Sequence, residues 1–426
     1  MRSFSWQISP DEFAAYHQRL RFQFQKWDSY VEGKLRLLPE SLVLSPAEHQ
    51  LIVEMSERLA RILRGLERRL KQRPDLLARL GIPDVVRDWI QKEPDSDWQL
   101  ARYDFFQTPD GRWQVCEFNE DVPGGFNEII SAARLLQPYH PGLKFVDEFA
   151  EALLRAVPAR GRIALMYATG YAEDLQHMVV LQQLLRQRGQ DSVLCSPRHL
   201  RKTWQGFTAC GQKVAAGIRF YPGEWFGLLE NRGDWEQAIR RWPMLNPLTR
   251  LITQSKAVFA VWEEAGVVSP DDLEFLREVA PLTYEAARQV ESPEFWCELE
   301  SQRPQWVLKQ NFGRMGDNVV MGSLVTEAQW SAALAEVRKR PVDWVVQRCF
   351  EVAPLDFAAG PQYPAVGAYL INGRFVGYYS RVAPAPFLTH QAIYVPTLID
   401  DRPFTVAGNS FGAKLAVPTN RSNAMN

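Results

Sequence analysis

The sequence predicts a mixed α/β fold built from more than one packed unit. Two hairpin signals favour antiparallel strands: "RYDFF" and "WQVCEF" flank the turn "TPDG" at 108–111, and a second pair of strand-like runs flanks Asn372-Gly373. A third observation is the order strand, helix, strand over 161–195, which is typical of a parallel α/β unit. Because 426 residues exceed one ordinary core, we expect two or three units.

The first 95 residues are predicted to form a helical segment. "SPDE" at 9–12 and "SPAE" at 45–48 each place Ser at the N-cap, Pro at the first helical position and Glu at the third. After the second start, apolar residues recur every three or four positions, at Leu51, Met55, Leu59, Ile62, Leu66 and Leu70. The opposite face is rich in arginine, at Arg58, Arg61, Arg64, Arg68 and Arg69. Interleaved glutamates offset this charge, so we expect a solvated face rather than a nucleic-acid surface.

Residues 156–250 are predicted to form a Rossmann-like subdomain. "GRIALMYA" has the pattern of a buried strand, "AEDLQHMVVLQQLLRQRG" is helical and "DSVLC" is a second strand. The segment lacks GxGxxG, so we do not expect a dinucleotide site there.

The remaining residues, 251–426, continue as alternating helices and strands. "SKAVFAVWEEAG" at 255–266 predicts one helix, and "SPDD" at 269–272 opens another. "QWVLKQNFGRMGDNVVMG" predicts a strand, a glycine-bearing loop and a strand. Helix "EAQWSAALAEVRKR", strand "DWVVQRCFE" and the hairpin at Asn372-Gly373 follow.

Composition excludes several classes of function. The formal net charge of −1 gives no electrostatic footprint for nucleic acid or an anionic membrane. The five cysteines are scattered without a CxxC pair, which argues against a zinc knuckle and a secreted disulfide framework. No apolar run approaches the ~18 residues that a membrane helix needs, and the amino terminus has no apolar signal core. We therefore expect a cytoplasmic protein.

The hairpin at 102–125 concentrates oxygen ligands of the kind that bind hard metal ions. Strand alternation puts Arg102 and Asp104 on one face, and likewise Glu117 and Asn119. If the strands pair through "TPDG", these two faces can be the same one, and the oxygens suit Mg²⁺. The alternative is an Arg–Asp ion pair beside a polar turn.

A second motif carries phosphate-binding features. Lys309 ends the strand "WVLK", and Gly313 and Gly316 follow in a loop whose backbone N–H groups can approach phosphate oxygens. The alternative is an ordinary Gly-x-x-Gly turn. The later segment "WVVQRCF" can offer backbone groups to an adenine edge, or can simply be a buried strand.

Taken together, these motifs resemble an ATP-grasp nucleotide site. The metal hairpin precedes the lysine loop in the chain, as in circularly permuted ATP-grasp proteins. The sequence resembles the synthetase portion of the glutathionylspermidine synthase family, whose hallmark is Arg-x-Asp followed by Glu-[aromatic]-Asn-x-Asp-x-Pro. "RYD" at 102–104 and "EFNEDVP" at 117–123 fit this hallmark position by position. We do not expect the amidase domain of the bifunctional family members within this sequence.

Other segments match the family more loosely. Ser255 stands where Asn is usual, Gln310 replaces a Pro after the lysine, and Val382 stands where an acid is usual. In the hinge strand, Val346 and Arg348 replace Tyr and Glu. These departures affect the lid, the hinge and the substrate side, so a changed substrate is plausible.

The resemblance implies a circularly permuted ATP-grasp fold with four parts. They are a helical segment over 1–95, the metal hairpin part of the catalytic domain over 96–155, a Rossmann-like pre-ATP-grasp subdomain over 156–250, and the lid with the rest of the catalytic domain over 251–426. The amino-terminal 90 residues match the family only weakly.

The resemblance also implies a role for each candidate residue. Asp104, Glu117 and Asn119 would hold Mg²⁺. Lys309 and Lys256 would meet the ATP phosphates, under the loop with Gly313 and Gly316. Val346 and Gln347 would sit at the adenine, and Arg102 and Arg381 would face the transferred phosphoryl group or the substrate carboxylate.

Some of these residues have plainer interpretations. Arg381 can be a surface ion-pair partner, and Lys256 can be a lysine whose stem alone is buried. Asp121 can be an outer acid of the metal site or only the residue that shapes the turn before Pro123. Cys116 and Cys349 are expected to be inert residues in core strands.

The implied reaction is the ATP- and Mg²⁺-dependent joining of a carboxylate to an amine through an acyl phosphate. Glutathione and spermidine are the family's substrates, and a homodimer is the state the family often uses. Two alternatives keep the same fold: a nucleotide-binding regulator that has lost ligation, and a kinase that stops at phosphoryl transfer.

Overall fold

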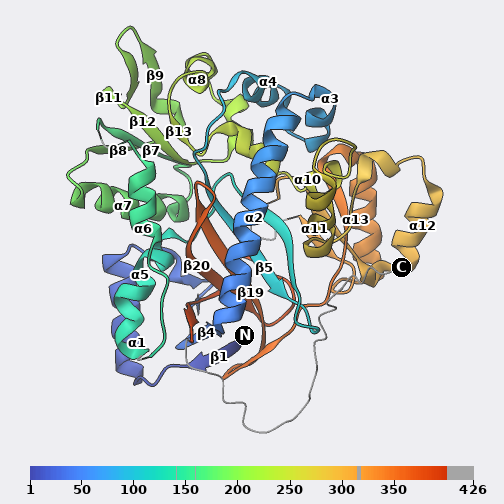
Figure 1. Ribbon diagram of the computed structural model, residues 1–426, viewed down its shortest axis with the longest axis horizontal. Coiled ribbons are helices and arrows are strands. Elements are labelled where there is room, and N and C mark those ends of the chain that lie inside the picture. Colours follow the sequence, from blue (N-terminus) through green and yellow to red (C-terminus); the bar gives the residue numbers. More distant parts are fainter. Residues whose placement is uncertain (141, 159, 314–317, 401–426) are drawn as a thin grey trace, which may run out of the picture.

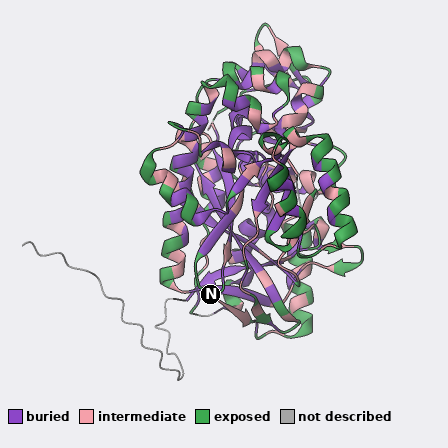
Figure 2. Ribbon diagram, turned by 90° about the vertical axis from the view of Figure 1, so that its right-hand side faces the viewer, coloured by how far each residue is buried: buried purple, intermediate pink, exposed green. Residues whose placement is uncertain are grey.

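The computed structural model describes residues 1–140, 142–158, 160–313 and 318–400, and it confirms the mixed α/β fold (Figure 1). Within these ranges three larger sheets form the framework. Buried residues concentrate on the sheets and on the inward faces of the helices around them, as Figure 2 shows. The predicted loop residue Gly316 lies outside the described residues.

The central sheet, here the hairpin sheet, has the strand order β21, β20, β19, β5 and β6, with β18 paired to β19. Its strands are β5 (Leu100–Gln107), β6 (Trp113–Asn119), β18 (Leu355–Phe357), β19 (Gly360–Ile371), β20 (Arg374–Ala383) and β21 (Ile393–Val395). Each adjacent pair is antiparallel. Both predicted hairpins are therefore confirmed.

Helices cover both faces of the hairpin sheet. They include α1 (Pro10–Gln23), α2 (Pro46–Lys71), α5 (Phe126–Leu136) and α6 (Phe149–Ala156). Along β19, Ala368 and Leu370 join the core that α2 fills, whereas Tyr369 joins the core of α5 and α6, because alternate side chains of a strand point to opposite faces. Arg102 lies opposite Tyr369 in the register and therefore belongs to the α5 side.

The predicted Rossmann-like unit is confirmed as a four-stranded parallel sheet in the order β13, β12, β7 and β8. Its elements are β7 (Ile163–Tyr167), α7 (Ala172–Gln187), β8 (Ser192–Cys195), β12 (Ala216–Phe220), α8 (Arg232–Ile239) and β13 (Met244–Leu245). A small antiparallel sheet is inserted after β8, made of β9 (Leu200–Thr203), β10 (Gly206–Ala209) and β11 (Gln212–Val214).

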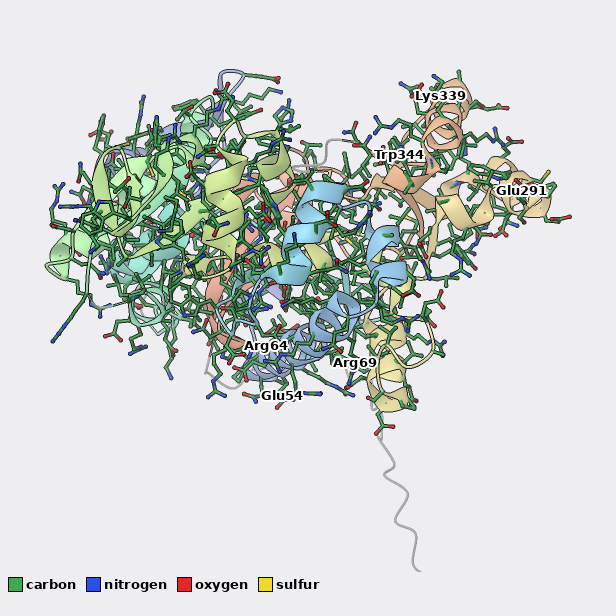
Figure 3. All side chains as sticks on the ribbon, turned by 90° about the horizontal axis from the view of Figure 1, so that it is seen from above. Glu54, Arg64, Arg69, Glu291, Lys339 and Trp344 are labelled. Carbon is green, nitrogen blue, oxygen red and sulfur yellow. The ribbon has the colours of Figure 1, made fainter. Side chains whose placement is uncertain are left out.

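The third sheet, with its helices, is called the lysine lobe because it carries Lys309. Its elements are β14 (Thr283–Glu285), α12 (Pro293–Ser301), β15 (Trp306–Gln310), β16 (Val319–Met321), α13 (Glu327–Lys339) and β17 (Trp344–Arg348). The strand order β14, β17, β15 and β16 makes β17 an inner strand. Seen from above, the lobe stands out from the rest of the molecule, with Glu291, Lys339 and Trp344 marking it in Figure 3.

The amino-terminal segment contains the two predicted helices and also strands that were not predicted. Helices α1 and α2 begin with complete capping boxes at Ser9 and Ser45, as expected. The further elements are β1 (Arg2–Ser5), β2 (Tyr30–Val31), β3 (Lys34–Leu35), β4 (Glu40–Leu44), α3 (Pro74–Leu77) and α4 (Asp84–Lys92). Strand β4 pairs in parallel with β22 (Thr397–Ile399), so its partner comes from the far end of the described chain.

Two local predictions were wrong. The expected helix over 255–266 is reduced to the short α10 (Val258–Val261), which follows α9 (Leu251–Gln254) and precedes α11 (Pro270–Val279). Ser255 ends α9 in an extended conformation and donates its hydroxyl to the carbonyl oxygen of Leu80 at 2.6 Å. On α2, Leu51 is 44% exposed and its neighbour Ile52 is buried instead, because the apolar face begins one position later.

The arginine-rich face of α2 contacts the first turn of α11 and the loop before β5. Arg58 and Arg61 approach Asp272, and Arg64 and Arg68 approach Asp97. No helix among the described residues combines the length and the apolar character needed to cross a membrane.

Candidate active site

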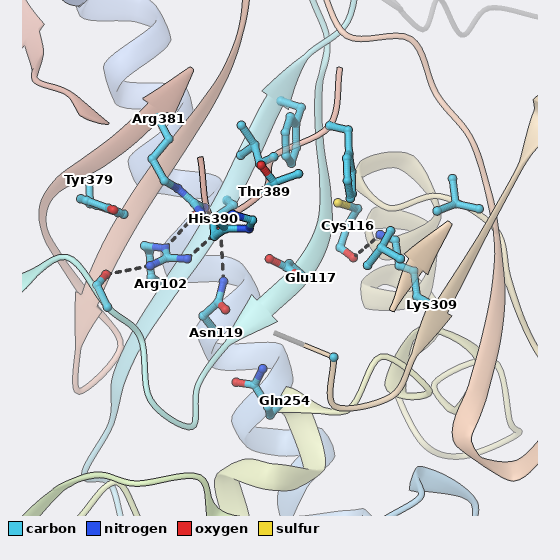
Figure 4. A pocket seen from close by; sticks show the side chains of 18 of the residues that line it. Arg102, Cys116, Glu117, Asn119, Gln254, Lys309, Tyr379, Arg381, Thr389 and His390 are labelled. Carbon is cyan, nitrogen blue, oxygen red and sulfur yellow. Dashed lines mark hydrogen bonds and ion pairs between the residues drawn. The ribbon is translucent and has the colours of Figure 1, made fainter. Parts of the chain in front are cut away.

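A cavity of about 380 Å³ opens where the hairpin sheet, the parallel sheet and the lysine lobe meet. Figure 4 shows its two principal walls. Eight of the predicted site residues line it: Arg102, Asp104, Glu117, Asn119, Lys309, Gly313, Gln347 and Arg381. Residues more than 200 positions apart in the sequence therefore converge on one space.

The predicted convergence of the hairpin residues is confirmed. Arg102 stands directly opposite Asn119 in the antiparallel register, and residues so paired share a face. The register shifts between Tyr103 and Phe105, so that Asp104 lies in an irregular stretch of β5. Asn119 Nδ2 donates to Asp104 Oδ2 at 3.2 Å.

Asp104 lies between two arginines. Arg102 donates from Nε to Oδ1 at 2.8 Å and from Nη2 to Oδ2 at 3.0 Å, while Arg381 donates from Nη2 to Oδ2 at 2.7 Å. Burial opposes ionisation of this carboxyl, but the two guanidinium charges outweigh it and lower the pKa of Asp104. Of the two alternatives set out above, the Arg–Asp ion pair is present, and the Mg²⁺ site stays a prediction. Arg381 is not a surface residue.

The oxygen ligands fit a magnesium site. Glu117 keeps 33% of its side chain exposed and lines the cavity. Asn119 donates an amide N–H to Asp104, so its amide oxygen is the atom that could bind a metal ion. Mg²⁺ binds through one or two carboxylates together with waters and substrate phosphates. The described residues contain no cluster of three His, Cys, Asp or Glu side chains that would form a closed metal cage.

Across the cavity, Lys309 has only neutral partners among the described residues. Its Nζ donates to Gln347 Oε1 at 2.6 Å and to the Cys116 carbonyl oxygen at 3.3 Å. Gln347 is held in turn, because its Nε2 donates to Thr283 Oγ1 at 2.9 Å. A buried ammonium with neutral acceptors is suited to meeting a phosphate.

Lys256 lies behind the cavity rather than on its surface. It is 2% exposed, so the interpretation of a lysine that is buried only along its stem is wrong. Its Nζ donates to the Gly313 carbonyl oxygen at 2.9 Å and lies 3.6 Å from Glu117 Oε2. Lys256 therefore links the glycine loop to a predicted metal ligand.

Val346 is a predicted site residue that the structure does not place on the cavity wall. Its side chain is buried in the core of the lysine lobe with Leu308 and Trp330, and it does not line the cavity. Its strand pairs on both edges, with β14 and β15. Arg348, Cys349 and Phe350 stand on the wall instead.

The cysteines Cys116 and Cys349 also differ from expectation. Cys116 lies in a strand, β6, as predicted, and Cys349 directly follows β17. Both cysteines line the cavity and are only partly buried, so the expectation of core side chains is wrong. Burial raises the pKa of each thiol, which keeps both protonated at neutral pH.

The exit of the hairpin is tied to the parallel sheet by buried polar groups that the sequence did not single out. Asn246 donates from Nδ2 to the carbonyl oxygens of Leu100 and Glu120 at 2.7 Å each. Gln254 Oε1 accepts the N–H groups of Glu120 and Asp121 at 2.9 Å each.

Asp121 belongs to this tie rather than to the metal ligands. Its Oδ1 lies 2.5 Å from Arg219 Nη1 of β12, and its Oδ2 accepts the Gly223 N–H at 3.0 Å. Both side chains of the pair are fully buried. Of the two interpretations given to Asp121, the structure favours the one in which it shapes the backbone.

His177 supports the loop beside Arg102. Its Nε2 accepts the Gly125 N–H at 2.8 Å and its Nδ1 donates to the Glu173 carbonyl oxygen at 2.7 Å. Burial lowers the pKa of His177 to about 4, so the ring is neutral at neutral pH. The adjacent Gly124 carbonyl oxygen accepts from Arg102 Nη1 at 2.7 Å.

Other residues that line the cavity have no motif in the sequence. They are Arg36, Tyr171, Glu173, Asp174, Trp225, Tyr379, Thr389 and His390. They come from the amino-terminal segment, the parallel sheet and the end of the hairpin sheet. Only His390, beside Thr389, stood out among the histidines in the sequence.

Comparisons with known proteins agree with this architecture. The family model described as glutathionylspermidine synthase preATP-grasp matches residues 11–400. The comparison with curated proteins gave no match.

Two solved structures are similar to this chain. A glutathione synthetase-like effector from Globodera pallida, in its apo form, has a TM-score of 0.57 at 11% identity, over 92% of this chain and 99% of that chain. At this identity it shows a shared fold alone. A putative gamma-glutamylcysteine synthetase from Methylobacillus flagellatus KT is less similar, with a TM-score of 0.44 at 14% identity, over 81% of this chain and 87% of that chain.

Proposed function

Because the chain belongs to the glutathionylspermidine synthase pre-ATP-grasp family, we propose that it is an ATP- and Mg²⁺-dependent carboxylate–amine ligase that works through an acyl phosphate. The fold is of the ATP-grasp type, and the family and fold make the protein an amide-forming synthetase in general. The metal, the intermediate and the circular permutation are parts of the proposal.

One observation carries the proposal: two carboxylates and an amide of the hairpin lie across a cavity from a buried lysine. Asp104, Glu117 and Asn119 would hold Mg²⁺, which supplies charge neutralisation at the phosphates. Lys309 would meet a nucleotide phosphate without losing an ion-pair partner among the described residues. Lys256 would hold the Gly313 end of the loop.

In this proposal the two arginines bind and orient the acid. A carboxylate oxygen attacks the terminal phosphorus of ATP and ADP leaves; the amine then attacks the carbonyl carbon and phosphate leaves. Neither step needs a protein nucleophile, because positioning and charge neutralisation supply most of the acceleration. Arg102 and Arg381 have the planar geometry that favours carboxylate and phosphate groups.

The first test is ATP-dependent phosphate release with Mg²⁺ across pools of thiol peptides, amino acids and polyamines. Wild type is compared with Glu117→Gln, and Glu151→Gln on an exposed part of α6 is the control. The ligase predicts release that needs both an acid and an amine, disappears in Glu117→Gln and survives in Glu151→Gln.

Other outcomes identify the alternatives. Formation of ADP that needs an acid but no amine, without release of inorganic phosphate, would indicate a kinase. Binding of Mg·ATP by calorimetry without release in any pool would indicate a regulator. Absence of Mg·ATP binding would contradict a nucleotide site altogether. Glutathione and spermidine as substrates, a cytoplasmic location and a homodimer stay predictions.

A further inference from the structure

The side of the cavity formed by Arg102, Asp104, Glu117, Asn119 and Arg381 is here called the hairpin wall. Tyr379 of β20 lies against both of its arginines. The guanidinium carbon of Arg102 is 5.2 Å from the centre of its ring and that of Arg381 is 5.5 Å away. Tyr379 lines the same cavity and is buried. Figure 4 shows its ring beside the two arginines.

The arrangement brings two like charges onto one counter-charge. Arg102 and Arg381 share Asp104, so the three side chains carry a net charge of about +1. The guanidiniums repel one another, and burial strengthens this repulsion. The face of an aromatic ring carries partial negative charge and attracts a cation, so the ring offsets part of the repulsion.

The two arginines depend on the ring to different degrees. Arg102 makes two hydrogen bonds to Asp104 and a third to the Gly124 carbonyl oxygen. Arg381 makes one hydrogen bond to Asp104, and its buried Nε has no partner among the described residues. A buried donor without a partner is rare and points to a ligand that completes it.

The ring itself is fixed from two sides. Tyr394 stacks on it with ring centres 5.7 Å apart and planes 12° apart. Gly125 packs against the ring with a φ of +111°, and a Cβ there would lie 2.6 Å from its Cγ and Cδ2 atoms. Only glycine satisfies both the backbone conformation and the close approach. The ring therefore has little freedom to turn away from the arginines.

We propose that Tyr379 is a positioning residue that holds Arg381 at the cavity wall with its Nε donor reserved for an incoming anion. The identity of that anion, the acid substrate or the transferred phosphoryl group, rests on the proposed function. The contact between ring and guanidinium does not.

The first experiment tests the contact without turnover. Protein labelled with ¹⁵N at arginine gives a resonance for the Arg381 Nε–H group, assigned by its loss in Arg381→Lys. Ring currents from Tyr379 shift this resonance. We expect it to move in Tyr379→Leu, to stay in Tyr379→Phe, and to shift on titration of wild type with inorganic phosphate.

The control variant is Tyr378→Leu. Tyr378 is the neighbouring residue on β20, is buried, and faces the core on the opposite side of the sheet. It reports what the loss of a buried ring does to the fold without touching the arginines. An Arg381 resonance that Tyr379→Leu leaves in place, or that Tyr378→Leu moves equally, would overturn the proposal.

The second experiment uses an acid substrate found in the pools. Tyr379→Leu is expected to raise the KM for the acid about tenfold, by disordering the arginine. In an Arg381→Lys background it should add little, because residues that act through one another are not additive. The KM for ATP should stay within about twofold of wild type in each variant. Multiplying effects in the double variant would contradict the proposal.

Two further substitutions of Tyr379 that keep an aromatic ring of similar size test the proposal even if Tyr379→Leu does not fold. Phe at position 379 keeps the negative ring face, whereas pentafluorophenylalanine has a similar size and an inverted face. The KM for the acid should be preserved with Phe and raised with the fluorinated ring, and equal values would overturn the proposal. If no pool supports turnover, the proposed ligase fails, while the resonance still decides the role of Tyr379.

Discussion

The two walls of the cavity handle charge in different ways. On the hairpin wall, Asp104 is bound by two arginines, and Glu117 and Asn119 lie beside it. On the lysine wall, Lys309 donates to an amide oxygen and a backbone carbonyl oxygen. The arginines of the first wall have a charged partner in that wall, whereas the second wall holds a cation whose described partners are neutral.

This difference separates what each wall contributes. A metal ion or an anion that enters the hairpin wall must exchange partners with an existing ion pair, so binding there is selective. A phosphate that reaches Lys309 replaces only neutral acceptors, so binding there adds a charge partner. Removing a charge should accordingly have opposite effects on the stability of the two walls.

The largest effect is expected for Asp104→Asn. It leaves two buried guanidiniums without their carboxylate, which typically costs about 3–5 kcal/mol of unfolding free energy. Phosphate release should fall about 100-fold or more, because a metal ligand and the arginine anchor are lost together. Chemical denaturation and the release assay measure the two effects.

Asp121→Asn is the matched control for that variant. Asp121 also pairs with an arginine and is fully buried, but Arg219 lies outside the cavity lining. Stability should fall comparably, while calorimetry should find Mg·nucleotide affinity close to that of wild type. Equal loss of affinity in both variants would mean that general destabilisation, and not the cavity wall, explains the Asp104 result.

Lys309→Met tests the opposite wall. We expect affinity for Mg·nucleotide to fall about 10- to 100-fold, as one charge contact to a phosphate is lost. The melting temperature should hold or rise, because the substitution removes a buried charge that has no charged partner among the described residues.

Arg79→Met is the comparison at the base of the lysine lobe, where Arg79 from the amino-terminal segment pairs with Glu285 of β14. Arg79 pairs with Glu285 and Glu264. Glu264 keeps its pair with Arg288, but Glu285 is buried and loses its ion-pair partner, so the substitution should lower the melting temperature. A Lys309→Met protein that melts as early as Arg79→Met would contradict the distinction between the walls.

An intermediate effect is expected from acid, through His177. The ordinary histidine pKa of 6.5 falls to about 4 in the folded protein, so the unfolded chain binds the proton first as pH falls. The stability that the neutral ring contributes is complete above pH 6.5 and declines by about 3 kcal/mol on the way to pH 4. Denaturation curves between these values measure the decline.

His177→Gln should flatten that part of the pH profile. Gln can still accept the Gly125 N–H but does not titrate in this range, so the loop that holds Arg102 no longer depends on pH. An unchanged slope in the variant would show that the decline comes from other groups.

The smallest effect concerns thiol labelling. Cys116 and Cys349 line the lysine side of the cavity, whereas Cys210 and Cys297 are exposed. Mg·nucleotide should slow alkylation of the first pair several-fold and leave the second pair unchanged, as read by mass spectrometry. Protection by an acid substrate alone would place the acid on the lysine wall instead.

Features encoded by neighbouring residues were predictable from the sequence. The capping boxes at Ser9 and Ser45 and the turn at Asn372-Gly373 are complete within a few residues, so they predicted their elements correctly. The pattern of Arg102, Asp104, Glu117 and Asn119 also needed only one hairpin, and the structure brings these residues together.

Features that depend on distant partners were not predictable. The break before α10 depends on a hydrogen bond between Ser255 and Leu80, far apart in the chain. The residues of β17 alternate between two faces, but the sequence does not tell which face is the core. In the structure α12 and α13 pack on the face that carries Val346, so its side chain is buried. Tyr379 has no motif, because its neighbours Tyr394, Gly125 and Arg102 meet only in the folded protein.

The buried tie at the hairpin exit has a mechanical consequence. The hairpin sheet is fastened to the parallel sheet by Asn246, by Gln254 and by the pair Arg219–Asp121. We therefore expect the two sheets to behave as one rigid unit. The lysine lobe is anchored near its base by Arg79–Glu285 and by Lys256. We therefore expect the cleft to open by rotation of the lysine lobe about that base, a movement that would leave Asp104 and its two arginines in place.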